Sequence, residues 1–436
     1  MQLFGNSRSR KVGVLTLVPL FALTAGAIGP VDAAQCQPGV YGQGQEGFVV
    51  IGGPLPGFGA GQRYLFRDGR RGATVSAKSP VVCDSNVATV TQPDGSTRQW
   101  PREPTRESDA IFNSAATKLV GRLIEPSGNP DPDRPLVVLV HGSEKTAAID
   151  SVYAYMLAAQ GISVFVYDKR GTGASDGDYT QNFELLADDA AAALKEARRL
   201  AVGRFGRAGF FGGSQGGWVA PLAATRSPAD FVAIGFGLVV SPIEEDREQL
   251  LDEARQMRLD AQAMAKVEQL SRATAELVRS HFVRGYRELA RVRREIGTAS
   301  WALTIKGEYS GDMLRMSETD LRRIGRARFD SLGLIWDYDA TAALRKLRVP
   351  LLWVLAADDR EAPIETTRAA LLKVATTGKP LDAYIFPDTD HGMVEFLTNG
   401  DGSRTPTRIT DGYLKLVADW IKSNVHGSYG RAQRLR

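Results

Sequence analysis

Cysteine and histidine are scarce in this chain of 436 residues, which has two cysteines and four histidines. So few thiols and imidazoles exclude a disulfide-dense miniprotein and leave no cluster with metal-ligand spacing, so we expect no catalytic metal. Lysine and arginine nearly balance aspartate and glutamate, and a net charge of +4 does not favour nucleic acid as a partner. The glycines of Asp168–Gly177 lack the dinucleotide-binding spacing, and no phosphate-binding loop occurs, so we expect no cofactor.

Long apolar runs are also lacking after the first 33 residues. Three basic residues within positions 8–11 precede the uncharged run Val12–Ile28, and small residues follow at Val31 and Ala33. This order is typical of a cleaved secretory signal, so we expect residues 1–33 to be a signal peptide and the mature protein to be secreted or periplasmic without a stable membrane anchor. An uncleaved anchor is the alternative, but the run has about 17 residues, the lower limit for a span, and contains glycine and proline.

The two cysteines, Cys36 and Cys83, both lie early in the predicted mature chain. In an oxidising compartment two such residues are expected to form one disulfide. The alternative is a pair of free, partly buried thiols.

The pattern of apolar residues divides the chain into five further segments. Residues 34–105 hold short β-like runs and turn signals, which predict a small β-rich N-terminal module. In residues 106–241 and 346–426, short apolar runs alternate with helical periodicity, which predicts an α/β core with a mostly parallel sheet flanked by helices. Residues 242–345 show helical periodicity and little strand signal, so we expect a helical cap. Residues 427–436 are polar and basic and are expected to be a disordered tail.

Within the cap, apolar residues recur every three or four positions between 278 and 296. An amphipathic face needs an apolar partner, and we expect that partner to be the rim of a cleft at the edge of the predicted sheet. Phe282 and Tyr286 would then set the size of the pocket in that cleft. The alternative is that this face packs the cap against itself.

The segment Gly212–Gly216 fits the pattern G-x-S-x-G and follows an apolar strand that ends at Phe211. A helix is predicted directly after it. This strand–turn–helix order is the one that a nucleophile elbow needs, because a sharp turn projects the serine hydroxyl above the sheet. Ser214 is therefore the candidate nucleophile.

A serine hydroxyl needs a base, and His391 is the candidate because it lies in the loop after the final predicted core strand. The base needs a carboxylate, and Asp358 and Asp359 both leave the strand that ends near residue 355. The interval to Pro363 favours Asp359, with Asp358 as the alternative.

A tetrahedral intermediate needs two backbone N–H donors. The residue after the nucleophile, Gln215, supplies one, and the loop His141-Gly142-Ser143 after a buried strand supplies the other from Ser143. His141 precedes Ser214 in the chain, which is the wrong order for the base, so we interpret it as a residue that shapes this loop.

Taken in order, these motifs resemble the α/β-hydrolase superfamily, and the chain is similar to secreted bacterial esterases and to prolyl oligopeptidase-like serine peptidases. The resemblance covers about residues 115–240 and 345–425. It implies the α/β-hydrolase fold, a Ser214–His391–Asp359 triad and an acyl-enzyme mechanism. The chain departs from the pattern at Glu144 and Ala356, where glycine is usual.

The leading hypothesis is a secreted serine hydrolase that cleaves small carboxylic esters. A serine peptidase acting on short peptides and a thioesterase are the alternatives within the fold, although residues 34–115 are too few for the β-propeller of prolyl oligopeptidases. A binding module that kept the fold is the non-enzymatic alternative, and it would be expected to have lost a member of the triad.

Overall fold

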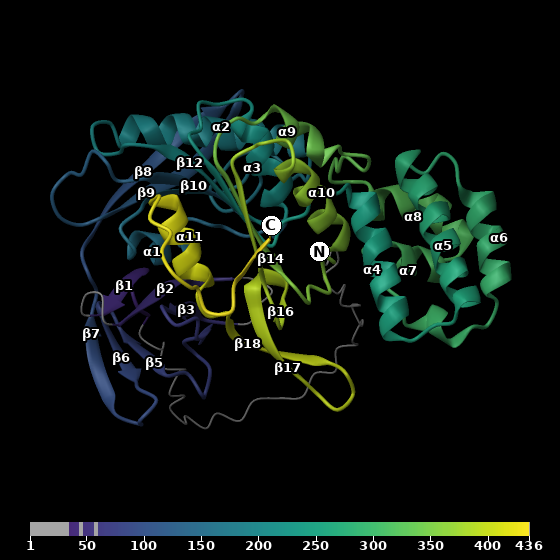
Figure 1. Ribbon diagram of the computed structural model, residues 1–436, viewed down its shortest axis with the longest axis horizontal. Coiled ribbons are helices and arrows are strands. Elements are labelled where there is room, and N and C mark those ends of the chain that lie inside the picture. The colour runs from purple at the N-terminus through teal and green to yellow at the C-terminus, as the bar shows by residue number, and fades with distance from the viewer. Residues whose placement is uncertain (1–34, 43–46, 56–59, 436) are drawn as a thin grey trace, which may run out of the picture.

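A mixed sheet of nine strands forms the centre of the computed structural model, which describes residues 35–42, 47–55 and 60–435 (Figure 1). In spatial order the strands are β19 (Gln433–Leu435), β15 (Leu381–Phe386), β14 (Leu351–Ala356), β13 (Val232–Gly235), β12 (Ala208–Gly213), β10 (Leu136–Val140), β11 (Ser163–Tyr167), β9 (Thr117–Pro126) and β8 (Thr105–Ser114). The six strands from β15 to β11 are parallel, whereas β9 pairs antiparallel with β11, β8 with β9 and β19 with β15.

Helices cover both faces of this sheet, as the apolar runs predict. All five residues of β10 are buried: Leu136 and Val138 belong to the apolar cluster under one set of helices, and Val137 and Leu139 to the cluster under the other. The first set comprises α2 (Phe183–Leu200), α3 (Gly216–Ala224), α9 (Ala340–Lys346) and α10 (Glu365–Ala375), and the second comprises α1 (Val152–Ala158) and α11 (Tyr413–Ile421).

Between β13 and β14 the chain leaves the sheet and forms a helical segment, for which we keep the name cap, and its helices lie together beside the sheet in Figure 1. They are α4 (Pro242–Gln256), α5 (Ala261–Arg279), α6 (Tyr286–Ile296), the short 3₁₀ helix Ser300–Leu303, α7 (Ser310–Arg315) and α8 (Glu318–Phe329). Ser241 caps the first of them, because its hydroxyl accepts the N–H of Glu244 and Pro242 starts the helix without a donor to satisfy.

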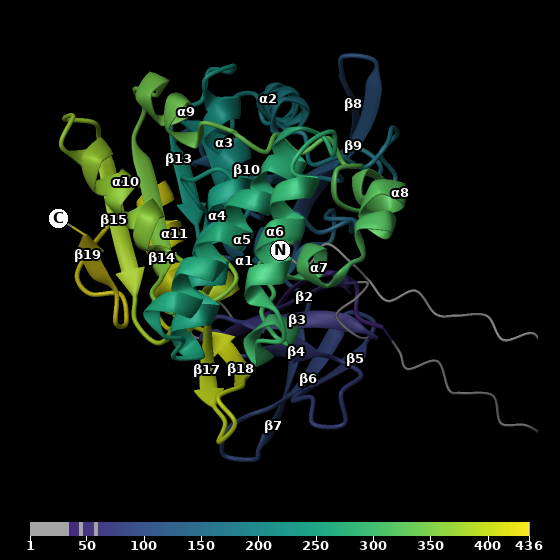
Figure 2. The ribbon, with the colours of Figure 1, turned by 90° about the vertical axis from the view of Figure 1, so that its right-hand side faces the viewer.

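The N-terminal module consists of two small antiparallel sheets, which lie near the hairpin of β17 (Val394–Thr398) and β18 (Arg404–Ile409) in Figure 2. Their strands are β1 (Gly39–Gly42), β2 (Phe48–Pro54), β3 (Gln62–Phe66) and β4 (Arg71–Ala73) in one, and β5 (Val81–Asp84), β6 (Val87–Thr91) and β7 (Thr97–Pro101) in the other. The β-rich character predicted for this segment is confirmed.

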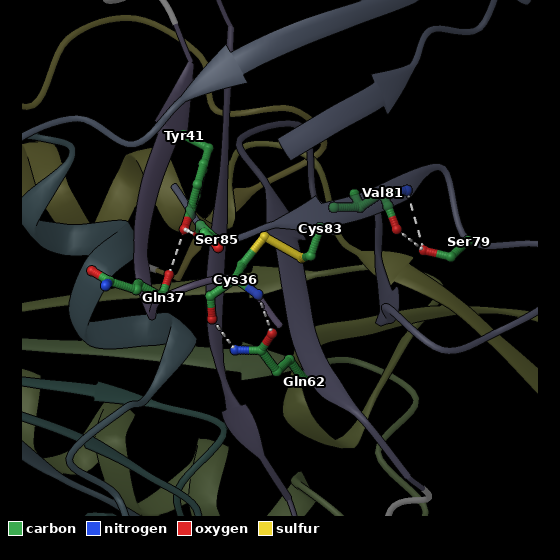
Figure 3. Close-up of a disulfide and its surroundings, with 8 residues drawn as sticks. All are labelled: Cys36, Gln37, Tyr41, Gln62, Ser79, Val81, Cys83 and Ser85. Carbon is green, nitrogen blue, oxygen red and sulfur yellow. Dashed lines mark hydrogen bonds between the residues drawn. A yellow bond between two sulfur atoms is a disulfide. The ribbon is translucent and has the colours of Figure 1, made fainter. Parts of the chain in front are cut away.

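The predicted disulfide between Cys36 and Cys83 is present and joins the start of the module to β5 (Figure 3). The side chain of Gln62 binds the backbone of Cys36 twice, as acceptor at 2.9 Å and as donor at 2.7 Å. The hydroxyl of Tyr41 donates to the carbonyl of Gln37 at 2.6 Å. Cys36 is buried in the apolar cluster of the module, so the bridge is part of its core.

The expectation of a disordered tail at 427–436 is wrong for most of that segment. Gln433–Leu435 forms β19 and pairs with the edge strand β15, which otherwise exposes a row of unpaired backbone groups. Tyr429 is buried against the core. The signal peptide predicted for residues 1–33 lies outside the described residues. Among the helices of the described part of the chain, none has the length and apolarity needed to span a bilayer.

Candidate active site

Ser214 lies at the turn between β12 and α3, at the carboxyl end of the sheet. Its backbone has a φ of +51°, a left-handed conformation that is rare for residues other than glycine. A Cβ on Gly216 would lie 2.5 Å from the carbonyl oxygen of Val140, so the turn requires glycine at that position. The local sequence therefore produces the sharp strand–turn–helix that the G-x-S-x-G pattern predicts.

The imidazole of His391 lies beside this serine. Its Nε2 is 3.2 Å from the Oγ of Ser214, and its Nδ1 is 2.9 Å from Oδ2 of Asp359. The ring of Phe236 packs edge-on against the imidazole with centroids 5.1 Å apart. The structure thus brings together three residues that are far apart in the sequence. Ser214 follows β12, Asp359 follows β14, and His391 follows the short strand β16 (Thr389–Asp390).

The two neighbouring aspartates have different surroundings. The Asp359 side chain is 1% exposed, and its Oδ1 accepts the N–H groups of Glu361 and Ala362 at 3.0 and 2.7 Å. The side chain of Asp358 is 41% exposed and lies 3.9 Å from the guanidinium of Arg404. Only Asp359 is positioned to hold the His391 ring.

A second carboxylate faces the same imidazole. Oε1 of Glu361 lies 3.7 Å from Nε2 of His391, and the Glu361 side chain is 42% exposed. Burial disfavours the charged imidazolium, but the carboxylates of Asp359 and Glu361 outweigh burial and raise the pKa of His391 to about 9. The site therefore stabilises the imidazolium, the state that accompanies an anionic tetrahedral intermediate.

Two backbone N–H groups beside Ser214, those of Ser143 and Gln215, donate no hydrogen bond to a carbonyl or side chain of the described residues. Both are the groups that the sequence predicts for the oxyanion hole. Ser143 belongs to residues 141–144, here called the oxyanion loop, and a Cβ on Gly142 would lie 3.3 Å from the Cβ of Ser214. The loop thus passes directly against the serine.

Ser214 and His391 open onto a cavity of about 890 Å³. Its wall comes from several parts of the fold: the oxyanion loop, Arg71 from β4 of the N-terminal module, and Tyr413 from the start of α11. Leu332 is the residue that the segment 242–345 contributes to the lining. A space of this size accommodates a drug-sized ligand.

Phe282 and Tyr286 do not reach this cavity, so the expectation that they line the acyl pocket is wrong. The ring of Phe282 stacks on Phe329 of α8 at 6.1 Å, and the guanidinium of Arg322 lies 3.9 Å from the centroid of Tyr286. The face formed by Phe282, which precedes α6, and Tyr286, which starts it, packs the cap against itself, as the alternative interpretation expects.

Sequence motifs do not identify several residues around the site, including Glu361, Arg71 and Leu332. Their positions depend on how distant loops pack, and no local pattern marks them. The hairpin of β17 (Val394–Thr398) and β18 (Arg404–Ile409) did have a signal, since Asn399-Gly400 is typical of a tight β-turn. Within the described ranges, no group of three or more histidine, cysteine, aspartate or glutamate side chains is arranged to hold a metal ion.

Residues 131–294 match the family model described as serine aminopeptidase, S33. No protein in the curated comparison matches the chain. Solved structures that are similar to it include an acylaminoacyl peptidase of Pyrococcus horikoshii, at 15% identity and a TM-score of 0.41 over 79% of this chain and 50% of that one. An esterase of Pyrococcus furiosus matches at 16% identity and a TM-score of 0.40, over 66% of this chain and 84% of that one.

The present chain thus spans half of the length of the acylaminoacyl peptidase that it matches. The observations agree on one architecture: a mixed sheet with six parallel central strands and helices on both faces, a serine on a strained turn after a central strand, and a family match across that strand. The chain has the α/β-hydrolase fold and resembles the serine hydrolases that are built on it.

Proposed function

We propose that this protein is a serine hydrolase that cleaves carboxylic esters through an acyl-enzyme. The observation that carries the proposal is the hydrogen-bonded series Asp359–His391–Ser214 at the wall of a cavity. A serine without a base is a poor nucleophile, and a base without an orienting carboxylate can present the wrong tautomer. This arrangement meets both needs.

In the proposed reaction, Oγ of Ser214 attacks the ester carbonyl carbon while Nε2 of His391 takes the hydroxyl proton. The carbonyl oxygen becomes an oxyanion, which the N–H groups of Ser143 and Gln215 receive. The imidazolium then protonates the departing alkoxide, and the C–O bond to the alcohol breaks. Water attacks the acyl-enzyme by the same steps, with His391 as base again, and releases the acid and Ser214.

Asp359 has an orienting role in this scheme. Its carboxylate accepts a hydrogen bond from the N–H of Nδ1, which leaves Nε2 free to face Ser214, and its two backbone contacts fix the carboxylate. It is not expected to take the proton itself.

Amide hydrolysis is a second candidate, and the position of Glu361 favours it. This carboxylate lines the cavity beside His391, where it can pair with the free amino group of a peptide. The partial match to serine aminopeptidases agrees with this alternative.

A panel of p-nitrophenyl esters from acetyl to dodecanoyl, assayed beside aminoacyl-p-nitroanilides and their N-acetylated forms, tests both candidates. The ester proposal expects turnover of the esters by the wild type and loss on the order of 10⁶ in kcat in Ser214→Ala. Ester turnover that persists in folded Ser214→Ala would contradict it. A preference for free-amine anilides over acetylated ones that disappears in Glu361→Gln would favour the peptidase.

We further propose that the protein is exported and that residues 1–33 are removed. The basic–apolar–small pattern of the N-terminus supports this, and a disulfide is compatible with an oxidising compartment. Expression of the full chain with fractionation and intact-mass measurement tests it. The expected product begins near residue 34 outside the cytoplasm, and a full-length cytoplasmic product would overturn the proposal.

A further inference from the structure

Two carbonyl groups of the oxyanion loop, those of Gly142 and Ser143, are held from one neighbouring segment, which also contacts the side chain of His141. That segment, residues 167–179, begins at the last residue of β11 and is called here the clamp segment. Nε2 of His141 lies 3.3 Å from the carbonyl oxygen of Tyr167, and Nζ of Lys169 donates to the carbonyl of Gly142 at 2.6 Å. The hydroxyl of Tyr179 donates to the carbonyl of Ser143.

Lys169 is placed behind the loop rather than in the cavity. It is 3% exposed and is not part of the cavity wall, whereas Gly142 and Ser143 are. A lysine is almost never fully buried without a partner, and the partner here is a backbone carbonyl. Burial lowers the pKa of Lys169 to about 8 against the opposing charge of Glu144. Below that pH the ammonium makes a charge-assisted hydrogen bond to the carbonyl, about twice as strong as a neutral one, and above it the neutral amine still donates there.

The direction of that carbonyl determines the direction of an oxyanion donor. The carbonyl of Gly142 and the N–H of Ser143 belong to one peptide unit, which is planar and trans, so the two groups point in opposite directions. Because Lys169 holds the carbonyl toward the buried side, the N–H of Ser143 must point toward the side of the cavity. A flip of this peptide would replace the donor by a carbonyl oxygen.

We propose that Lys169 is a positioning residue that fixes the Gly142–Ser143 peptide with its N–H in the oxyanion hole. The inference rests on the proposed function, since it concerns a donor that acts only in the hydrolytic transition state. Tyr179 assists by holding the next carbonyl along the loop, that of Ser143.

The charge of Lys169 has a second consequence, because the loop carries an acid at position 144. The carboxylate of Glu144 lies 3.3 Å from Nδ1 of His141 and close to Gly142. Burial raises the pKa of Glu144, but the hydrogen bond and charge of His141 and the charge of Lys169 outweigh burial and lower it to about 2. Lys169 thus offsets an anion that would otherwise oppose the developing oxyanion beside it.

The variant Lys169→Met removes the donor and the charge while keeping an unbranched apolar stem. We expect kcat for a short p-nitrophenyl ester to fall by ~10–100-fold, less than the 10²–10³ that follows complete loss of an oxyanion donor. KM is expected to stay within about threefold, because the interaction is made in the transition state and not in the ground state. Binding of a trifluoromethyl ketone, whose adduct with the serine carries an oxyanion, should weaken by the same factor as kcat.

Lys145→Met is the matched control. Nζ of Lys145 lies 5.5 Å from the ring centroid of Tyr179, and that of Lys169 lies 5.3 Å from it, so both ammonium groups share a neighbourhood. Within the described residues, Lys145 makes no hydrogen bond to a carbonyl of the oxyanion loop. We expect kcat of this variant to stay within about threefold of wild type, with any effect confined to KM.

Folded Lys169→Met with wild-type kcat and wild-type affinity for the ketone would overturn the inference. Equal losses in kcat for both lysine variants would also overturn it, because they would indicate a general effect of charge. Neither result contradicts the proposed function. The proposed function is contradicted instead if the wild type has no activity that depends on Ser214. Circular dichroism and thermal melting establish that each variant is folded.

If Lys169→Met does not fold, the variant Tyr179→Phe tests the inference instead. It removes only one hydroxyl, from a partly exposed ring, so it is expected to fold. The inference expects a fall of ~3–10-fold in kcat with KM retained, and an equal weakening of ketone binding. Unchanged kcat and ketone binding in Tyr179→Phe would then overturn the role of the clamp segment.

Discussion

Replacing Glu361 by glutamine tests the electrostatics of the site, because the change keeps the size of the side chain and removes its charge. The carboxylate lies 3.7 Å from Nε2 of His391. Two unit charges at about 4 Å interact by about 1 kcal/mol in water and several times more at lower effective dielectric. Since the Glu361 side chain is 42% exposed, solvent screening favours the lower figure, so the variant is expected to lower the pKa of His391 by about 0.5–1 pH unit.

The assay is the pH profile of kcat/KM for a p-nitrophenyl ester, whose acid limb reports the free enzyme's base. His391 must be neutral to accept the serine proton, so activity rises with pH through its pKa. Asp359 and Glu361 raise that pKa to about 9, and the wild-type limb is therefore expected above the ordinary value of 6.5. The limb of Glu361→Gln should lie at lower pH, and the difference should shrink in high salt.

Asp358→Asn is the control for this experiment. Its side chain is 41% exposed, nearly the same as that of Glu361, but its carboxylate pairs with Arg404. We expect its acid limb to stay within about 0.2 pH unit of wild type. An unchanged limb in Glu361→Gln, a limb at higher pH, or equal displacement in both variants would refute the reasoning.

Three further predictions follow from the structure. Asp359→Asn should lower kcat/KM by ~10⁴, whereas Asp358→Asn should have a small effect, and the reverse order would move the orienting role to Asp358. Reduction of the Cys36–Cys83 bridge, which closes a loop of 47 residues, should destabilise the N-terminal module by about 2–4 kcal/mol in denaturant unfolding, and two thiols that alkylate without reductant would contradict it. Leu332→Ala should change the ratio of kcat/KM between long and short esters by about 10-fold, and an unchanged ratio would show that this side chain does not limit the acyl chain.

The raised pKa of His391 also has a consequence for stability. A group whose pKa is higher in the folded state binds its proton more tightly there, so it contributes stability that is complete below pH 6.5. That contribution is lost as the pH rises through about 9. The same preference for the protonated imidazole favours the transfer of the Ser214 proton to His391 in the proposed mechanism.

The parts of the site that are visible in the sequence are those with a local pattern. The elbow around Ser214 combines an apolar strand, a spaced pair of glycines and a helix, and each of these can be recognised from a few consecutive residues. The alternation of strands and helices predicts that loops after different strands meet at one edge, which is why His391 and Asp359 could be named. These inferences need only topology and chain order.

The remaining residues depend on packing between distant loops. Glu361 lies next to His391 because the loop after β14 turns back toward β16 (Thr389–Asp390), and nothing in its neighbours marks that turn. Lys169 belongs to a glycine-rich segment whose spacing excludes a dinucleotide site, and its contact with Gly142 joins two loops 27 positions apart. The strand β19 escapes prediction because its three residues are polar and gain their structure from pairing with β15.

Labelling with a fluorophosphonate, followed by peptide mass spectrometry, tests the central claim most directly, because the probe reacts with a serine that an adjacent base activates. The account predicts one adduct per chain, located on Ser214, and its absence after Ser214→Ala or after denaturation of the wild type. No adduct on folded wild-type protein, or an adduct on a different residue, would contradict the assignment of Ser214 as the nucleophile.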